Sequence, residues 1–179
     1  MTDEPKGLRA TPAGGTRYET RVVDVVVLAP APPASRDRWR VLTLRRAAGV
    51  RCTGAWELVH GSIEASERPA EAARREVQEE TGLPVERLYS LTVNPFYLHA
   101  QDTVQLAVVF AAIVPPDATV HLGPEHDAYR WRTPLGATRT LQWPREHDAV
   151  RYAMWLLRSG DAGHAEDVLR ISPAVPSRG

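Results

Sequence analysis

The alternation of apolar and polar positions along the chain predicts several β-strands. Trp39–Arg45 alternates with a period of two residues, which is typical of a strand with one buried face. Arg21–Leu28 is rich in valine and ends at a proline-rich stretch, so we expect it to form an antiparallel pair with Trp39–Arg45. Thr103–Val114 is almost continuously apolar, which indicates a central strand. Further strands are predicted at Trp56–Val59, Leu88–Leu98 and Asp127–Arg132.

Two other segments favour helices. Pro69–Thr81 is predicted to be a helix because Pro69 suits the first helical turn and Gly82 suits a left-handed C-cap. Arg145–Arg158 is predicted to be a second helix, whose apolar face comprises Val150, Ala153, Met154 and Leu157. Strands that surround two helices favour an α/β fold with a mixed sheet covered on both faces.

The chain of 179 residues is long enough for one domain with a full hydrophobic core. Apolar residues make up 43% of it and charged residues 25%, which is ordinary for a globular protein. No linker or internal repeat divides the sequence. We therefore expect one domain at residues 17–171, flanked by flexible termini at residues 1–16 and 172–179 that are rich in Gly, Pro and polar residues.

Charge and cysteine content argue against several classes of function. Basic and acidic residues both total 22, so a nucleic-acid polymer is not an expected partner. The single cysteine, Cys52, excludes an internal disulfide and a zinc site built on several thiolates. The sequence shows neither a secretory signal nor an apolar stretch long enough to span a bilayer, so we expect a cytoplasmic protein without a membrane partner. A homodimer is compatible with the sequence, but no feature indicates one.

Three carboxylates share one face of the first predicted helix. Glu76, Glu79 and Glu80 stand at positions i, i+3 and i+4, where like charges repel one another. A hard divalent cation would relieve this repulsion, and oxygen ligands suit Mg²⁺ or Mn²⁺ better than zinc. Taken alone, the cluster is equally compatible with a solvated acidic helix face.

The residues around this cluster resemble the catalytic motif of the Nudix hydrolase family. That motif is a glycine, five residues, a glutamate, seven residues, Arg-Glu, an apolar residue, any residue, Glu-Glu, any residue, a glycine and an apolar residue. Every fixed position is met within residues 61–83, by Gly61, Glu67, Arg75, Glu76, Val77, Glu79, Glu80, Gly82 and Leu83. The resemblance implies a Nudix-type α/β/α sandwich with a mixed central sheet, in which the motif forms a loop, a helix and a loop.

The resemblance also implies roles for the motif residues. The ligands of Mg²⁺, or of Mn²⁺ in its place, would be Glu76, Glu79, Glu80 and the Gly61 carbonyl. Glu79 would also belong to the catalytic residues, and Arg75 and Glu67 would pair to brace the loop against the helix. The family's metals bridge the oxygens of a diphosphate and activate the attacking water.

Candidate substrate-binding residues lie just before the motif. Arg45 and Arg46 follow a predicted strand, at a place where the Nudix fold brings basic residues near the phosphates. His60 directly precedes Gly61 and is a second candidate for contact with the substrate. Two arginines at a strand end are equally compatible with an ordinary protein surface.

A second segment narrows the resemblance. Residues 125–131, Glu-His-Asp-Ala-Tyr-Arg-Trp, followed by Pro134–Ala137, are similar to the bacterial subgroup that hydrolyses dihydroneopterin triphosphate and dATP. In that subgroup the equivalent of Glu125 completes the metal site or acts as the general base. The chain departs from the subgroup at His60, where threonine is common, so the identity of the base or pterin stays open.

These features predict a Mg²⁺-dependent hydrolase that acts on a small molecule resembling a nucleoside triphosphate and releases a monophosphate and pyrophosphate. An ADP-ribose or dinucleoside polyphosphate hydrolase is the alternative within enzymes. A Nudix-fold sensor that binds a nucleotide without cleaving it is the alternative from another class. A sensor need not keep every metal-binding carboxylate, and this chain keeps all of those in the motif.

Overall fold

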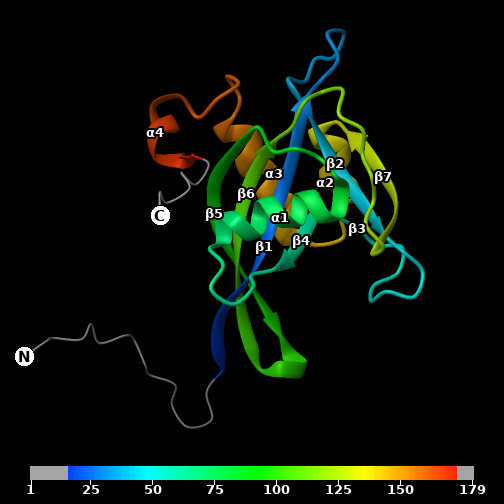
Figure 1. The fold of residues 1–179 in the computed structure, drawn as a ribbon, viewed down its shortest axis with the longest axis vertical. Helices are drawn as coiled ribbons and strands as arrows, with labels where there is room; N and C mark the ends of the chain where they lie inside the picture. Colours follow the sequence, from blue (N-terminus) through cyan, green and yellow to red (C-terminus); the bar gives the residue numbers. More distant parts are fainter. Residues whose placement is uncertain (1–15, 173–179) are drawn as a thin grey trace, which may run out of the picture.

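The computed structural model describes residues 16–172, and these form one mixed β-sheet with helices on both faces (Figure 1). The eight strands are β1 (Arg17–Pro30), β2 (Trp39–Arg46), β3 (Trp56–Glu57), β4 (Val59–Ser62), β5 (Arg87–Leu98), β6 (Thr103–Ile113), β7 (His126–Arg132) and β8 (Arg170–Ile171). The predicted flexible termini lie outside the described residues, apart from Thr16 and Ser172.

The strand order confirms two expectations from the sequence. The sheet runs β3-β2-β1-β6-β5-β8, while β4 pairs with β1 and β7 pairs with β2. β1 and β2 form the predicted antiparallel pair, with Leu28 opposite Val41. β6 lies between β1 and β5, as its continuous apolar character predicted, and it runs parallel to β1. That one parallel pairing makes the sheet mixed.

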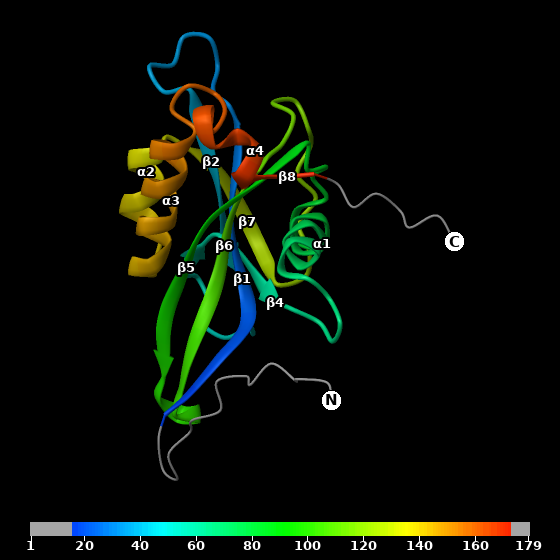
Figure 2. The same cartoon turned by 90° about the vertical axis from the view of Figure 1, so that its left-hand side faces the viewer.

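The helices form the outer layers of the sandwich. They are α1 (Pro69–Thr81), α2 (Pro134–Thr140), α3 (Pro144–Leu156) and the short α4 (Glu166–Leu169), accompanied by 3₁₀ turns at His99–Gln101 and Gly163–Ala165. Figure 2 shows α1 on one face of the sheet and α2 with α3 on the other. The predicted α/β/α arrangement is therefore confirmed. None of the helices in residues 16–172 has the length and apolar character needed to cross a membrane.

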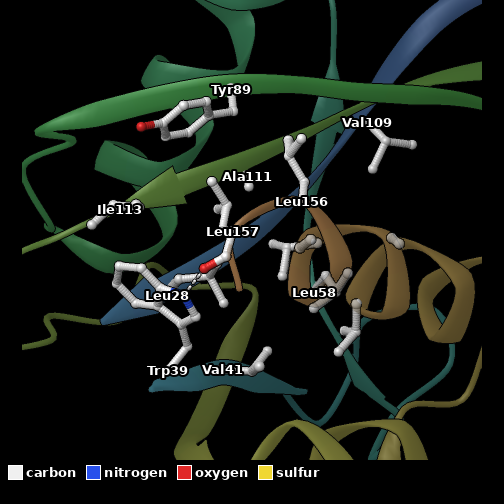
Figure 3. Packing of buried hydrophobic residues seen from close by; sticks show 14 of the residues in the cluster. Leu28, Trp39, Val41, Leu58, Tyr89, Val109, Ala111, Ile113, Leu156 and Leu157 are labelled. Atoms are coloured by element: carbon white, nitrogen blue, oxygen red, sulfur yellow. Dashed lines mark hydrogen bonds between the residues drawn. The ribbon is translucent and has the colours of Figure 1, made fainter. Parts of the chain in front are cut away.

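Two hydrophobic cores share the central strand β1. Val26 and Leu28 face the core beneath α2 and α3, whereas Val25 and Val27 face the core beneath α1. Because successive side chains of a strand point to opposite faces, an apolar run is what a strand covered on both sides requires. In the first core the Trp39 indole N–H donates to the Leu157 carbonyl at 2.8 Å, joining β2 to the end of α3 (Figure 3).

Several predicted elements differ from the observed ones. The single strand expected at Trp56–Val59 is wrong, because this segment divides into β3, which pairs with β2, and β4, which pairs with β1. The second helix ends at Leu156 rather than Arg158. Helix α2 was not predicted, although Thr133 caps it by accepting a hydrogen bond from the Gly136 N–H at 3.1 Å.

Candidate active site

The loop before α1 and the helix itself bring the first carboxylate against the backbone of β4. A Cβ atom added to Gly61 would lie 1.8 Å from the Glu76 carboxyl carbon, a distance that real structures do not tolerate. Glycine at this position thus lets the Glu76 carboxylate lie directly on the peptide of Gly61. Helix α1 holds Glu76 in place because Pro69 begins the helix and Gly82, at φ 67°, ends it in the left-handed conformation.

Arg75 connects the loop to the helix through several hydrogen bonds. Its guanidinium contacts both oxygens of Glu67 at 3.0 Å and donates to the Ser62 carbonyl at 2.7 Å. The same group donates to Glu76 at 2.9 Å and to Glu79 at 3.1 Å. Arg75 therefore compensates part of the charge of the cluster, and it contacts Glu67, the residue with which the family resemblance implies that it braces the loop.

Glu80 is the most deeply buried carboxyl of the helix face. Its side chain is 11% exposed, and burial, followed by the negative charges of Glu76, Glu57 and Glu125, raises its pKa to about 9. One carboxyl oxygen is buried without a hydrogen-bond partner. A bound cation would strongly stabilise the ionised form of such a carboxyl, because it replaces the hydration that burial removes from the charged group.

A buried network lies beneath Glu80 and was not predicted from the sequence. His126 lies with Nε2 3.1 Å from Glu57, and its Nδ1 is 3.8 Å from Glu80. Arg46 donates to Glu57 at 2.7 Å and lies 3.6 Å from Glu125. Burial would raise the pKa of Glu57, but the hydrogen bonds from His126 and Arg46 lower it overall. Glu57 is thus an ionised anchor that holds Arg46 at the edge of the site.

A loop opposite α1 carries Glu125. The Gly123 N–H donates to the Glu80 carbonyl at 3.0 Å, which ties this loop to the end of the helix. The Ala47 N–H donates to the Glu125 carbonyl at 2.9 Å, which ties it to the end of β2 as well. Both attachments are main-chain bonds, so the Glu125 side chain itself remains exposed and faces the carboxylates across the space between them.

These elements enclose a space of about 460 Å³ that we call the carboxylate cavity. It is lined by Arg46, His60, Gly61, Ser62, Glu76, Glu79, Glu80, Gly123, Pro124, Glu125 and His126. The structure thus brings together Gly61, the three helix carboxylates, Glu125, Arg46 and His60, all of which the sequence singled out. Arg75 and Glu67 are not part of this lining, but Arg75 donates hydrogen bonds to Glu76, Glu79 and the Ser62 carbonyl, which are.

Arg45 is the one predicted site residue that the structure places elsewhere. It pairs with Asp127 at 2.7 Å, with both side chains about two-fifths exposed. The pairing of β2 with β7 shifts register between Arg45 and Arg46. Neighbouring strand residues point to opposite faces, and Arg46 lines the carboxylate cavity whereas Arg45 does not.

The donor set of the carboxylate cavity fits a hard divalent cation. Glu76, Glu79 and Glu80 supply oxygens, one Glu80 oxygen is buried without a partner, and the Gly61 backbone lies against Glu76. Within residues 16–172 no three His, Cys, Asp or Glu side chains are already arranged to hold a metal ion, and Arg75 donates hydrogen bonds to both Glu76 and Glu79. A bound cation would supply positive charge opposite the oxygens of a diphosphate.

A second space of about 580 Å³, which we call the aromatic cavity, adjoins the first and shares Arg46 and His60 with it. It is lined by Arg46, Arg51, Cys52, Glu57, His60, Pro95, Phe96, Tyr97, Leu98, Trp143, Pro144 and Arg145. Asp24, on β1, lies behind it, 2.6 Å from His60 and 2.9 Å from Arg145. Burial would raise the pKa of Asp24, but His60 and Arg145 lower it, so this buried carboxyl is ionised.

Comparison with known proteins identifies the family. Residues 20–155 match the NUDIX domain family, so the chain belongs to that family. It is 41% identical over 135 residues to an octanoyltransferase from Myxococcus xanthus, covering 74% of this chain and 36% of that protein. It is 53% identical over 41 residues to an RNA pyrophosphohydrolase from Cereibacter sphaeroides, covering 23% of this chain and 25% of that one. The chain therefore spans well under half the length of the curated relatives it matches.

Solved structures support the same fold. A NUDIX hydrolase from Listeria monocytogenes superposes with a TM-score of 0.63 at 23% identity, covering 79% of this chain and 96% of that one. The dihydroneopterin triphosphate pyrophosphohydrolase of E. coli superposes with a TM-score of 0.57 at 24% identity, covering 72% and 92%. At these identities the likeness concerns the fold and not the substrate.

Proposed function

We propose that the protein is a Mg²⁺-dependent pyrophosphohydrolase. It cleaves the diphosphate linkage of a small substrate resembling a nucleoside triphosphate, of the dATP or dihydroneopterin triphosphate type, into a monophosphate and pyrophosphate. The observation that carries the proposal is the convergence of the motif's candidate metal ligands, Gly61, Glu76, Glu79 and Glu80, on one cavity. Glu76 rests on Gly61, and the buried Glu80 has an oxygen without a partner.

The geometry suggests a division of labour around the diphosphate. Glu76, Glu79, Glu80 and the Gly61 carbonyl would hold the cation, which would neutralise charge on the diphosphate oxygens. Arg46, held by Glu57, would donate hydrogen bonds to a phosphate from the opposite side. Glu125 and Glu79 are exposed carboxylates on opposing elements, so either is placed to accept the proton of the attacking water.

One feature supports a triphosphate substrate over a dinucleotide: the segment that begins at Glu125 resembles the dihydroneopterin triphosphate subgroup. Glu125 lines the carboxylate cavity and lies 3.6 Å from Arg46. A panel of dATP, other deoxynucleoside triphosphates, dihydroneopterin triphosphate, ADP-ribose and diadenosine polyphosphates would test this choice. We expect a monophosphate and pyrophosphate, identified by mass, from a triphosphate. Two monophosphates would indicate the ADP-ribose or dinucleoside class, and no turnover of any compound would indicate a sensor.

The metal assignment has a separate test. Glu80→Gln removes the charge of the buried carboxyl and keeps its shape, so we expect turnover to fall by about a hundredfold or more. Glu86→Gln, on the exposed residue just before β5, is the matched control and should keep the normal rate. Activity should require Mg²⁺ or Mn²⁺ and survive a zinc-selective chelator. A Glu80→Gln variant with a near-normal rate would contradict the assignment.

A further inference from the structure

The aromatic cavity is built by elements that the catalytic motif does not include. One wall comes from the end of β5, which supplies Phe96, and another from the start of α3, which supplies Trp143 and Arg145. The turn between β2 and β3 supplies Cys52. The volume of about 580 Å³ lies within the range of small-molecule sites, roughly 300–1,000 Å³.

Asp24 is an unusual residue that contacts two residues of the cavity lining, His60 and Arg145. Its side chain is fully buried within the valine-rich part of β1, where an unpaired carboxylate would be very costly. It lies 2.6 Å from His60 Nδ1 and accepts a hydrogen bond from Arg145 Nε at 2.9 Å. Asp24 therefore fixes two side chains that come from β4 and α3, and both of them line the aromatic cavity.

Arg145 presents a flat surface because it is held at both ends. Its guanidinium lies 4.6 Å from the centre of the Phe96 ring and 5.9 Å from that of Trp143. The Asn94 side chain donates to the Arg145 carbonyl at 3.0 Å, which holds the backbone. A planar guanidinium held beside two aromatic rings forms with them a surface on which another flat ring can stack.

We propose that the aromatic cavity binds the planar heteroaromatic ring of the substrate, and that Asp24 is the positioning residue that shapes it. This inference rests on the proposed function, since the shared wall at Arg46 and His60 places the ring beside the phosphate chain of one molecule. Phe96 and Trp143 stack on the ring, Arg145 supplies a cationic plane, and Asp24 orients Arg145 and His60.

Cys52 allows the ring site to be tested without catalysis. It is the sole cysteine, it is exposed, and it lies on the wall of the aromatic cavity. We expect AMP, GMP, CMP, UMP or neopterin to slow the labelling of Cys52 by N-ethylmaleimide in metal-free protein, measured as a single mass adduct. Ribose 5-phosphate, which lacks the ring, should not slow it. Equal slowing by ribose 5-phosphate, or no slowing by any of the five ring compounds, would overturn the proposal.

Variants locate the effect at named residues. Phe96→Ala and Trp143→Ala should each raise the KM of the preferred substrate about tenfold while kcat changes little, because stacking is lost and the carboxylate cavity is intact. Trp155→Ala is the matched control: Trp155 also has an arginine over its ring, Arg158 at 5.2 Å, but it lies outside the cavity. An unchanged KM in both cavity variants would contradict the assignment.

The role of Asp24 needs a readout that a purely structural residue would not affect. Asp24→Asn should abolish the protection of Cys52 by the ring compounds and raise KM more than it lowers kcat. Arg145→Lys keeps a positive charge beside Asp24 but removes the planar guanidinium. This variant therefore tests the ring-binding surface of the aromatic cavity if Asp24→Asn does not fold. Normal protection in a folded Asp24→Asn or Arg145→Lys protein would refute the positioning role.

The two proposals fail in different ways. If a ring compound protects Cys52 but no substrate is hydrolysed, the proposed hydrolase activity is contradicted and the proposed ring site is supported. If the protein hydrolyses a substrate and none of the cavity variants changes the kinetics, the hydrolase activity is supported and the ring site is contradicted.

Discussion

Three buried carboxyl groups differ in charge state because they differ in the donors around them. Asp24 contacts His60 and Arg145, and these partners outweigh the cost of burial, so its pKa is lowered. Glu80 has only a main-chain hydrogen bond from His60 and three negative neighbours, so its pKa rises to about 9. Glu146 accepts one bond, from the Leu58 N–H at 3.0 Å, and its pKa rises well above the ordinary value. Of these three groups, only Asp24 has surroundings that favour its charged form.

The close contact between Gly61 and Glu76 leads to the first prediction. Gly61→Ala would place a Cβ atom 1.8 Å from the Glu76 carboxyl carbon, so the carboxylate must leave its position. A displacement of this size is expected to lower kcat by about a hundredfold, because catalytic geometry tolerates little misplacement. Steady-state kinetics at saturating Mg²⁺ would measure the loss. Ala65→Ser, an exposed position in the same loop, should behave like the natural protein, whereas near-normal turnover by Gly61→Ala would contradict the tight contact.

Glu146 makes a prediction about stability and pH. Burial first, and then the negative charge of Asp24, raise its pKa well above the ordinary value of 4.5, so the folded state holds a proton that the unfolded state releases. The free energy of unfolding should therefore fall as pH rises above about 4.5, by up to about 1.4 kcal/mol per unit from this group, until the folded pKa is passed.

Glu146→Gln should remove that dependence. The glutamine can still accept the Leu58 bond but cannot ionise, so the variant's free energy of unfolding, measured in urea, should depend less on pH above about 4.5. Glu86→Gln, at an exposed position, should follow the natural protein. A parallel pair of curves for Glu146→Gln and the natural protein would show that Glu146 is ionised when folded.

The site residues that could be predicted are those with local sequence signals. Glu76, Glu79 and Glu80 share a face through helical spacing alone. Glu57 and His126 meet only because β3 and β7 both pair with β2, which no local pattern reveals. Asp24 did carry a signal, since a carboxylate inside a run of valines must have buried partners, but the sequence does not say which partners they are.

The same distinction holds for whole elements. Helix α1 was predicted with its observed bounds because Pro69 and Gly82 act on the backbone locally. The division of residues 56–62 into β3 and β4 could not be predicted, because the two strands pair with different neighbours. Helix α2 has a Thr133 cap and Pro134 at its first turn, so its local signal existed, but seven residues are too few for a clear period.

The C-cap of α1 leads to a prediction at the scale of secondary-structure elements. Gly82 has φ 67°, and a Cβ atom there would lie 3.1 Å from the His121 Cβ. Gly82→Ala should lower the free energy of unfolding by about 1–2 kcal/mol, the cost of the left-handed conformation for a residue with a side chain. Because Glu79 and Glu80 occupy the last turn of α1, the Mg²⁺ concentration for half-maximal activity should also rise.

Gly163→Ala is the matched control for the C-cap. Gly163 has φ 56° and open space where a Cβ would lie, so its substitution carries the same backbone cost far from the motif. Chemical unfolding and Mg²⁺ titration of the two variants would separate the effects. Both variants should lose stability, but only Gly82→Ala should need more Mg²⁺ for half-maximal activity. Identical Mg²⁺ curves for the two variants would show that the C-cap of α1 does not influence the metal site.

At the scale of the molecule, the candidate site joins elements on both sides of the sheet. The carboxylates belong to α1, which packs on one core, while Arg145 and Trp143 belong to the segment that packs on the other. The strand β1 contributes to both cores and carries Asp24. Since the two cores share this strand, we expect the described domain to unfold in one step, and ligand binding at the site to stabilise the whole domain.

That expectation leads to a prediction about Mg²⁺ and pH. A cation that binds only the folded state adds about 2.7 kcal/mol at a hundredfold excess over its dissociation constant, so the thermal midpoint should rise with Mg²⁺. The pKa of about 9 means that Glu80 holds its proton at neutral pH and releases it when the cation binds. Binding should therefore tighten as pH rises from 7 towards 9, and the Mg²⁺-induced rise in midpoint should grow with it. In Glu80→Gln, which has no proton to release there, the rise should be small and flat with pH; an undiminished rise in this variant would place the cation elsewhere.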